Sequence, residues 1–404
     1  MKDEARREQI AFASAMTTEA DIERATHSLA AQIDEQLAGR SLDLALVFLS
    51  PPFGPVAGFV SENLRAALKP GLLIGCTGEG VIGREREVEQ GPAIALVGAH
   101  LPQVTLRPFA FPARAWADAL AGTGAFRQAV GAPVEARLFV LLADPFSTPM
   151  DRLLDAFNTA YAQVPVIGGL ASGASRPAGN ALLFEDRVFS GGAVGVALSG
   201  PFDVDVVVSQ GCRPIGRPLK ITSAQENFIL SLEGQPPLVY LQELVNQLSE
   251  TDRRLLQNGL FIGRAIDPDR DQAALGRGDF LIRGVVGIDQ ESGVIAIGDY
   301  VHQGETVQFH LRDATTATED LEMMLAPQMF FESPSGAFLF SCNGRGTRLY
   351  DHPNGDISTI QKVLGGVNLA GFFCAGEIGP IGGKNFLHGH TASMVLFRPP
   401  AGEN

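Results

Sequence analysis

The strongest constraint on the fold is a unit that occurs three times along the 404-residue chain. Each copy begins with a short apolar run, continues through a segment of helical length, and returns to a second apolar run that ends in glycines. The first runs of the copies lie at residues 42–49, 136–142 and 336–343. Because a strand, a helix and a further strand form one supersecondary element, three copies predict layers of helix and sheet.

The spacing of apolar residues within each copy separates helix from strand. Helices are expected at residues 56–68, 150–161 and 356–364. A closing strand is expected after each glycine turn, at residues 91–97, 192–198 and 391–397. We therefore expect an α/β fold of mixed β-sheets layered with helices, built from repeated strand–helix–strand–glycine-turn units in two modules.

The glycine turns that end the second apolar runs share a pattern. Cys76-Thr77-Gly78-Glu79 in the first copy matches Cys374-Ala375-Gly376-Glu377 in the third, and residues 169–172 stand at the corresponding place in the second. Glycine adopts backbone conformations that other residues avoid. These turns therefore allow a loop to approach a ligand or another backbone closely.

The region between the second and third copies has a different pattern of apolar and polar residues. Apolar runs at residues 280–288 and 294–297 flank a polar turn, which predicts a β-hairpin. Residues 236–248 have the pattern of a helix, and Gly211 to Gly216 is interpreted as a bend at a sheet corner. The pattern changes most near residues 223–235. We divide the chain there, into an N-terminal domain over residues 12–222 and a C-terminal domain over residues 223–398.

The net charge restricts the class of partner. At −14, the chain repels nucleic-acid phosphates and anionic lipid, so neither nucleic acid nor a membrane is expected as a main partner. No stretch reaches the roughly 18 consecutive apolar residues of a membrane-spanning helix. The first eight residues are charged and lack the apolar core of a signal peptide. We expect a cytoplasmic protein.

The cysteines are too few and too scattered for a disulfide framework. The four are Cys76, Cys212, Cys342 and Cys374. Each lies beside a glycine-containing turn that follows an apolar run, and no two form a CxxC pair. We expect reduced thiols at strand ends.

The densest group of polar residues lies among the C-terminal glycine loops. The candidate ligand-binding residues are Asn343, Arg345, Cys374, Glu377, Gly379, Lys384, His388, His390 and Thr391. An arginine can hold a carboxylate through two parallel hydrogen bonds, and Glu377 can accept hydrogen bonds from an ammonium group. Arg345 and Glu377 together match the two charged ends of an amino acid. The alternative is structural, an internal Arg345–Glu377 pair that holds two loops together.

A metal site built on His388 and His390 is the second interpretation, with Glu377 or Cys374 as further ligands. Two residues at this spacing on an extended segment point to opposite faces, so they converge only through an irregular turn. Structural or hydrogen-bonding roles are therefore favoured for both histidines. No metal and no other cofactor is predicted.

A thiol enzyme is the third interpretation. Cys374 or Cys342 would be the nucleophile, a histidine the base, and amides of the glycine turns the oxyanion donors. Buried cysteines at strand ends are usually inert, and the sequence offers no sign that a cysteine meets a histidine. A protein without enzymatic activity is favoured, and no catalytic residue is assigned.

These motifs resemble those of the FIST family, which consists of an N-terminal and a C-terminal FIST module. The resemblance runs from about Phe12 to Phe397. The segments that carry it are Ile74 to Gly80, Ile167 to Gly169, Gly191 to Val196, Phe340 to Gly346, Gly371 to Pro380 and His388 to Thr391. The C-terminal segments are the specific part, because the N-terminal glycine patterns alone are common.

The resemblance implies a sensory protein that binds a small ligand, such as an amino acid, and signals onward. Some relatives in this family are fused to signalling domains, and others to an F-box. No such segment is visible in this sequence, so we expect the output to pass through a signalling protein or through a homodimer. Two alternatives stay open: a protein-interaction scaffold without ligand, and a thiol-dependent hydrolase or transferase that uses Cys374.

Overall fold

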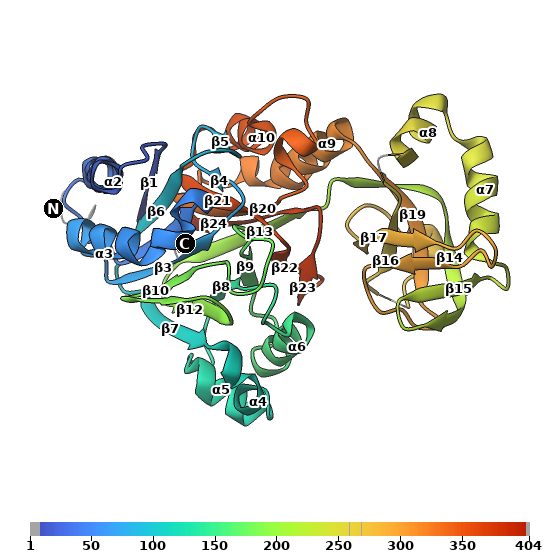
Figure 1. Cartoon of the computed structure of the whole chain (residues 1–404), viewed down its shortest axis with the longest axis horizontal. Coiled ribbons are helices and arrows are strands. Elements are labelled where there is room, and N and C mark those ends of the chain that lie inside the picture. The colour runs from blue at the N-terminus through green and yellow to red at the C-terminus, as the bar shows by residue number, and fades with distance from the viewer. Residues whose placement is uncertain (1–8, 258, 268, 401–404) are drawn as a thin grey trace. The chain divides into compact units, whose positions relative to one another are not determined.

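The structure is a computed structural model that describes residues 9–257, 259–267 and 269–400 (Figure 1). The chain forms two compact units. The first, called the three-sheet unit, comprises the described residues up to Val208 and from Leu321 onward. The second, called the barrel unit, comprises residues 209–320. The charged segment 1–8 considered above lies outside the described residues.

Within the described residues, the three-sheet unit contains three sheets of six strands each, and all three have the same order of strand types. The first sheet runs β1 (Ala11–Thr17), β6 (Ile94–His100), β2 (Leu44–Leu49), β3 (Leu72–Thr77), β10 (Leu182–Phe184), β11 (Arg187–Phe189). The second runs β7 (Thr105–Phe111), β12 (Ala193–Ser199), β8 (Leu138–Ala143), β9 (Val166–Leu170), β22 (Glu377–Ile381), β23 (Lys384–His388). The third runs β13 (Asp203–Ser209), β24 (Ala392–Arg398), β20 (Gly336–Cys342), β21 (Leu369–Cys374), β4 (Val81–Ile82), β5 (Glu87–Val88). The predicted mixed α/β fold is confirmed.

Each copy of the repeated unit is called a repeat below. The hairpin at the edge of each sheet belongs to a different repeat from the strand with which it pairs. Hairpin β4–β5 leaves the first repeat and pairs with β21 of the third. Hairpin β10–β11 of the second repeat pairs with β3 of the first, and hairpin β22–β23 of the third pairs with β9 of the second. The exchange is cyclic, so every repeat completes one neighbour and is completed by the other.

The helices cover the outer faces of the sheets, where separate apolar clusters lie. On the first sheet are α2 (Ile22–Leu37) and α3 (Ala57–Leu68), and on the second α4 (Trp116–Ala119), α5 (Thr123–Val130) and α6 (Met150–Ala160). On the third are α10 (Gly355–Leu364) and the C-terminal end of α9 (Ala314–Leu325). Short 3₁₀ turns lie at Pro51–Val56, Ala113–Ala115, Gln272–Ala274, Ala326–Phe330 and Gly346–Arg348. The predicted crossover helices are confirmed to within a residue of their ends.

The inner faces of the three sheets pack on one another in a common apolar core. Phe48 of the first repeat stacks on Phe372 of the third, with ring centroids 5.1 Å apart, and Phe340 meets the same ring edge-on at 5.9 Å. Central strands such as β2 are therefore buried on both faces. This double burial explains why their sequences are continuous apolar runs rather than alternating patterns.

A glycine in the second parallel strand marks the same position in all three repeats. A Cβ atom at Gly75, Gly168 or Gly371 would lie only about 2 Å from a carbonyl oxygen of the neighbouring parallel strand. These carbonyls belong to Val47, Leu141 and Leu339. Only glycine allows the two strands to approach so closely.

This register corrects the alignment of the glycine turns. Counted from Gly75 and Gly371, Cys374 corresponds to Gly78, and Cys76 corresponds to Phe372. The shared Cys-x-Gly-Glu pattern is therefore displaced by two residues between the first and third repeats. Glu79 and Glu377 do not occupy equivalent positions.

The barrel unit is a closed barrel in the order β14-β15-β18-β17-β16-β19, with β19 pairing back to β14. Its strands are β14 (Cys212–Gln225), β15 (Phe228–Leu232), β16 (Phe261–Ala265), β17 (Phe280–Ile288), β18 (Ile295–Ile297) and β19 (Thr306–Arg312). Helices α7 (Pro237–Gln247) and α8 (Glu250–Gln257) accompany them. The predicted β17–β18 hairpin is confirmed. The segment Gly211 to Gly216, expected as a bend, leads into the long strand β14, where Gly211 and Gly216 have φ values of 62° and 65° and the register with β19 shifts after Ile215.

Among the described residues, no helix combines the length and the apolar character that crossing a bilayer requires.

Candidate functional site

The loops that follow the second parallel strands of the three repeats meet at one point, here called the loop junction. Thr77 O accepts a hydrogen bond from Ser172 N at 3.1 Å, and Leu170 O accepts one from Ala375 N at 3.0 Å. The third contact departs from this symmetry, because the Ser172 hydroxyl donates to Phe373 O. The repeats are thus joined in a ring by their own backbones.

The Ser172 hydroxyl also accepts a hydrogen bond from Glu79 N at 2.8 Å. In a symmetric ring, the third contact would be a direct hydrogen bond from Glu79 N to Phe373 O. The Ser172 hydroxyl bridges these two atoms instead. The sequence places Ser172 only in a glycine turn of the second repeat, and the structure shows that it contacts both the first and the third repeat.

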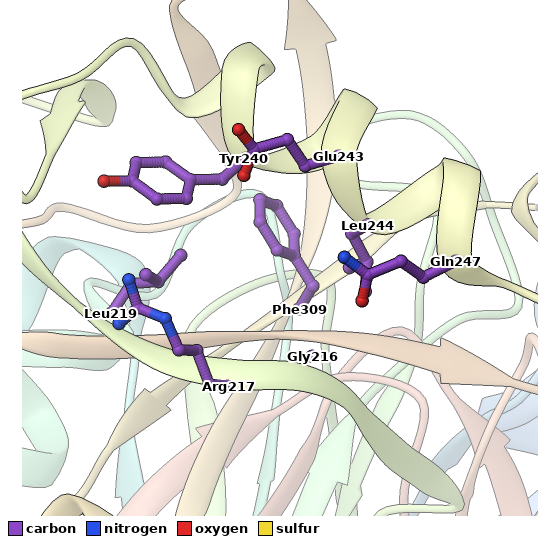
Figure 2. Close-up of a pocket in the computed structure, with 8 residues that line it drawn as sticks. All are labelled: Gly216, Arg217, Leu219, Tyr240, Glu243, Leu244, Gln247 and Phe309. Carbon is purple, nitrogen blue, oxygen red and sulfur yellow. The ribbon is translucent and has the colours of Figure 1, made fainter.

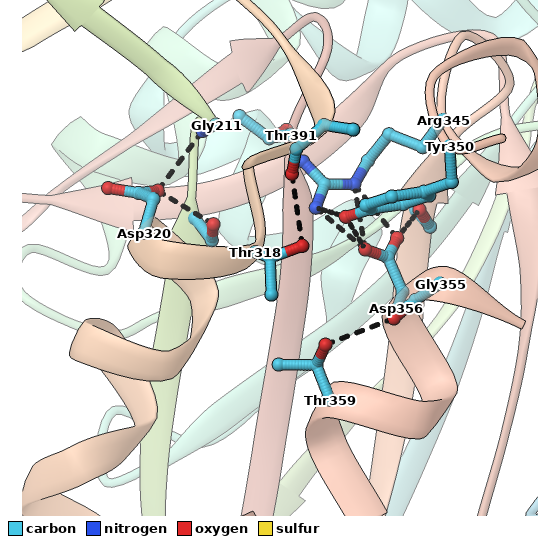
Figure 3. A network of polar contacts seen from close by, with 12 residues as sticks. Gly211, Thr318, Asp320, Arg345, Tyr350, Gly355, Asp356, Thr359 and Thr391 are labelled. Carbon is cyan, nitrogen blue, oxygen red and sulfur yellow. Dashed lines mark hydrogen bonds and ion pairs between the residues drawn. The ribbon is translucent and has the colours of Figure 1, made fainter. Parts of the chain in front are cut away.

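Arg345 lies beside this junction and is completely buried. Its Nε donates to Asp356 Oδ2 at 2.8 Å and its Nη2 to Asp356 Oδ1 at 2.6 Å, so the two side chains form a bidentate ion pair (Figure 3). Tyr350 Oη accepts from Arg345 Nη2 and donates to Asp356 Oδ1, both at 2.8 Å, and Ser341 Oγ donates to Asp356 Oδ2 at 2.7 Å. Burial raises the pKa of Asp356, but the charge and hydrogen bonds of Arg345 outweigh it and hold that pKa below its usual value.

Glu377 begins β22 and is also completely buried. Thr391 donates to Glu377 Oε2 twice, from Oγ1 at 2.7 Å and from its backbone nitrogen at 3.0 Å. The other oxygen, Oε1, is buried and accepts no hydrogen bond from any nitrogen or oxygen of the described residues. Burial raises the pKa of Glu377 to about 8, against the opposing effects of Thr391, Arg345 and the Cys342 thiol. The buried carboxyl group therefore holds its proton more tightly than an exposed glutamate does.

Glu87 is a third buried acid near Arg345, after Asp356 and Glu377, and no sequence motif marks it. It lies in β5, whose hairpin joins the third repeat by the exchange described above. Ile357 N donates to its Oε1 at 2.9 Å, while its Oε2 has no hydrogen-bond partner among the described residues. Burial, followed by the charge of Asp356, raises the pKa of Glu87 to about 8. Only the exchange of hairpins reveals this acid, because it stands in a charged loop without a recognisable motif.

All four cysteines are buried, and none of them forms a disulfide bond. Cys374 Sγ lies 3.5 Å from Phe372 O, and a Cβ atom on Gly169 would lie 2.4 Å from that sulfur. Burial is the main cause that raises the pKa of Cys374 well above its usual value. Because the thiolate is the reactive form, this geometry gives no support to Cys374 as a nucleophile.

His388 and His390 make different contacts. His388 is buried at the end of β23, and its Nε2 donates to Gly379 O at 2.9 Å. His390 has a φ of 68°, and its carbonyl accepts from Arg345 Nη1 at 3.4 Å. Over the residues that the structure describes, no group of three or more His, Cys, Asp and Glu side chains is arranged to hold a metal ion.

The remaining candidates divide between the cluster and its surroundings. Asn343 belongs to the cluster, since its backbone nitrogen donates to Cys374 O at 2.8 Å. Lys384 stands apart, exposed at the opposite end of the β22–β23 hairpin from the Glu377–His388 pair. The C-terminal cluster, as the name is used below, consists of Asn343, Arg345, Cys374, Glu377, Gly379, His388, His390 and Thr391.

Arg348 is a residue at this site that the sequence did not single out. More than half of its side chain is exposed, and its Nη1 donates to Asn343 O at 2.7 Å and to Glu79 Oε2 at 3.0 Å. The pair with Glu79 joins the first and third repeats at the rim of the loop junction. Its place three residues after Arg345, in the same glycine loop, was the available signal.

Two family models match the chain, the FIST N domain over residues 43–235 and the FIST C domain over residues 237–380. An uncharacterised protein of Mycobacterium tuberculosis strain H37Rv is 40% identical over 388 residues, which is 95% of this chain and 98% of that protein. An uncharacterised protein of Mycobacterium bovis is 40% identical over 386 residues, with 94% and 97% covered. The crystal structure of a cyanuric acid hydrolase from A. caulinodans aligns with 97% of this chain and 100% of its own, at 8% identity and a TM-score of 0.36.

Proposed function

We propose a sensory function for this chain, which belongs to the FIST family, as its two domain matches and its relatives show. FIST domains are associated with sensory and signal-transduction roles. In this proposal the chain binds a small molecule of the amino-acid class at the C-terminal cluster and passes the signal to a partner protein. The site, the ligand class and the partner are all parts of the proposal.

The observation that carries the proposal is the Glu377 oxygen that has no nitrogen or oxygen donor. A buried acceptor without such a donor is costly, and an ammonium group brings three. The ammonium group of an amino acid at Glu377 Oε1 would favour the ionised carboxylate and offset its burial. Arg345 stays with Asp356 in this arrangement, because breaking a buried pair costs about 3–5 kcal/mol.

Arg348 is the proposed partner of the ligand carboxylate, in place of Arg345. Its present partner Glu79 is about one-third exposed, and exposed ion pairs contribute only about 0–1 kcal/mol, so the exchange costs little. A short path of contacts leads from this rim to the buried acid. Arg348 donates a hydrogen bond to Asn343 O, next to Cys342 in the chain. The Cys342 sulfur accepts a hydrogen bond from Gly344 N at 3.4 Å, and the Cys342 thiol is also hydrogen-bonded to the Glu377 side chain.

The loop 343–346 is the element that has to move when a ligand enters. It contains two glycines, and Gly346 has a φ of 57°, in the left-handed region that favours glycine. An ammonium group at Glu377 would replace the Cys342 thiol and draw this loop into a second position. The loop leads directly into the 3₁₀ turn Gly346–Arg348, so binding at the buried acid would move Arg348 and alter the surface at the loop junction.

Thermal unfolding of the full chain against a panel of amino acids tests the proposal. A ligand at about a hundred times its dissociation constant adds roughly 2.7 kcal/mol, which raises the melting temperature by several degrees. Glu377→Gln and Arg348→Ala should each remove most of the shift. Glu322→Gln is the matched control, because Glu322 forms an exposed pair with Lys362 away from the cluster.

The proposal fails if no amino acid shifts the transition of the native chain. It also fails if a shift is found but persists undiminished in both Glu377→Gln and Arg348→Ala. A shift lost equally in Glu322→Gln would indicate a general change in stability and not a site.

A further inference from the structure

The barrel unit contains a cavity of about 250 Å³ that no sequence motif marks. It lies between helix α7 and strand β14, with one side chain of β19 rising between them (Figure 2). All of its lining residues fall within residues 216–309, so it belongs entirely to the barrel unit. The C-terminal cluster contributes nothing to it.

The floor of this cavity is apolar. Leu219 and Phe309 are buried members of the barrel core, and Leu244 of α7 packs against the same core. Gly216 keeps the floor open, because a Cβ atom there would lie 3.1 Å from the Leu244 side chain and its φ is 65°. The Gly216 carbonyl accepts from Gln308 Nε2 at 2.8 Å, which fixes the strand at this point.

The rim of the cavity carries an excess of negative charge. Arg217 is bound to Glu233 through two hydrogen bonds of 2.8 and 2.6 Å, so its charge is matched by that neighbour. Glu243 is exposed on α7 at the rim, and its negative charge also contributes to raising the pKa of Arg217, after the larger effect of Glu233. Two carboxylates therefore share one guanidinium here, which leaves the rim attractive to a further cation.

An aromatic wall stands beside the Glu243 carboxylate. In Figure 2 the Tyr240 ring and the Glu243 carboxylate lie next to each other above Phe309. The face of Tyr240 already attracts one cation, since the Arg217 guanidinium lies 5.8 Å from the ring centroid. An aromatic face next to a carboxylate is the combination that recognises an ammonium group.

We infer that the barrel unit binds a small primary amine with an apolar body at this cavity. The ammonium group pairs with Glu243 against Tyr240, and the apolar body lies on Leu219, Leu244 and Phe309. A cavity of about 150 Å³ is enough for benzene. The space available here therefore suits one ring with a short chain.

Three fluorinated probes of nearly equal shape test the charge of the ligand: para-fluorophenethylamine, the alcohol that replaces its amine, and para-fluorophenylacetate. Binding to the full chain is followed by fluorine NMR. The amine should bind saturably, about threefold to fivefold more tightly than the alcohol and at least about tenfold more tightly than the carboxylate, as an exposed ion pair and a cation–π contact allow.

Two variants locate the binding. In Glu243→Gln the amine should bind with about the same affinity as the alcohol. In Leu244→Trp the new side chain should fill the cavity and weaken the binding of all three probes at least about tenfold. Glu291→Gln is the matched control, an exposed glutamate of the same unit that does not line the cavity. It should leave amine binding unchanged.

Three results would overturn the inference. Binding of none of the probes would remove the site, equal binding of the carboxylate and the amine would remove the ligand class, and full amine binding in Leu244→Trp would place the amine elsewhere. Glu377→Gln should not affect amine binding. The sensory proposal for the C-terminal cluster and this inference can therefore fail separately.

Discussion

The C-terminal cluster of the three-sheet unit and the cavity of the barrel unit place their arginines in opposite environments. Arg345 is fully buried and bound to Asp356, Tyr350 and the His390 carbonyl, whereas Arg217 is bound to Glu233 at an exposed rim. Both ion pairs are bidentate, so they differ in their exposure to solvent and not in their hydrogen-bond geometry. Removing one partner of a buried ion pair leaves an uncompensated charge in the interior and costs much stability, whereas breaking an exposed ion pair costs little.

The largest expected effect is the loss of the buried arginine. Arg345→Met leaves the Asp356 charge buried without a cationic partner, so the three-sheet unit should lose about 3–5 kcal/mol of stability. Trp116 is the single tryptophan of the chain and lies in this unit, so its fluorescence reports the transition during denaturation. The double replacement Arg345→Met with Asp356→Leu should recover most of the loss. A loss below about 1 kcal/mol in Arg345→Met would contradict the contrast.

The next effect is a dependence of stability on pH that arises from the buried acids. The pKa of Glu377 is about 8 in the folded chain against an ordinary 4.5, so the folded state holds its proton more tightly than the unfolded state does. The stabilisation that this proton gives is fully present below pH 4.5 and is lost as the pH rises towards 8, at about 1.4 kcal/mol per pH unit. The pKa of Glu87 is also raised to about 8, so its proton likewise stabilises the folded state less as the pH rises. Denaturation followed by Trp116 fluorescence should show a shallower decline in Glu377→Gln, and an unchanged slope would contradict the burial argument.

The two proposed sites should also differ in the pH dependence of ligand binding. An ammonium group needs the ionised form of Glu377, so the affinity of the cluster for an amino acid should rise by about tenfold per pH unit between pH 6 and pH 8. The residues that line the barrel cavity include no buried acid, so amine affinity there should change by less than about twofold. Titrations at matched ionic strength provide the comparison. A flat profile for the amino acid would place its ammonium group away from Glu377.

The smallest effect is expected at the exposed arginine. Arg217→Ala removes the pair with Glu233, and the stability of the barrel unit should change by less than about 1 kcal/mol. Circular dichroism during thermal unfolding measures the change. A loss as large as that of Arg345→Met would mean that exposure does not govern the two pairs.

Local patterns in the sequence were enough to predict the repeats. The continuous apolar runs of β2, β8 and β20 and the periodic segments of α3, α6 and α10 are properties of short stretches, and the structure confirms both. The closure of the barrel was not predicted, because pairing of β14 with β19 joins segments that are far apart in sequence. The irregular register of β14, between Ile215 and Leu219, also obscured its strand character.

The C-terminal cluster was predicted as a set of residues but not as a set of contacts. The acid chosen for Arg345 was Glu377, in the next glycine loop, whereas the structure pairs Arg345 with Asp356 in the first turn of α10. Both acids follow Arg345 along the chain, and nothing local separates them. Glu87 was missed for a similar reason, since it reaches the third repeat only through the exchanged hairpin.

The exchange of hairpins also sets an order of events during synthesis. Hairpin β4–β5 leaves the ribosome early, but its partner β21 is made only near the end of the chain. The first repeat therefore waits, with an edge strand unpaired, while the second repeat and the whole barrel unit are translated. Contacts between such distant segments close slowly, and an open strand edge is prone to wrong pairing. The first sheet can be completed as soon as the second repeat is made, whereas the second and third sheets both wait for strands of the last repeat.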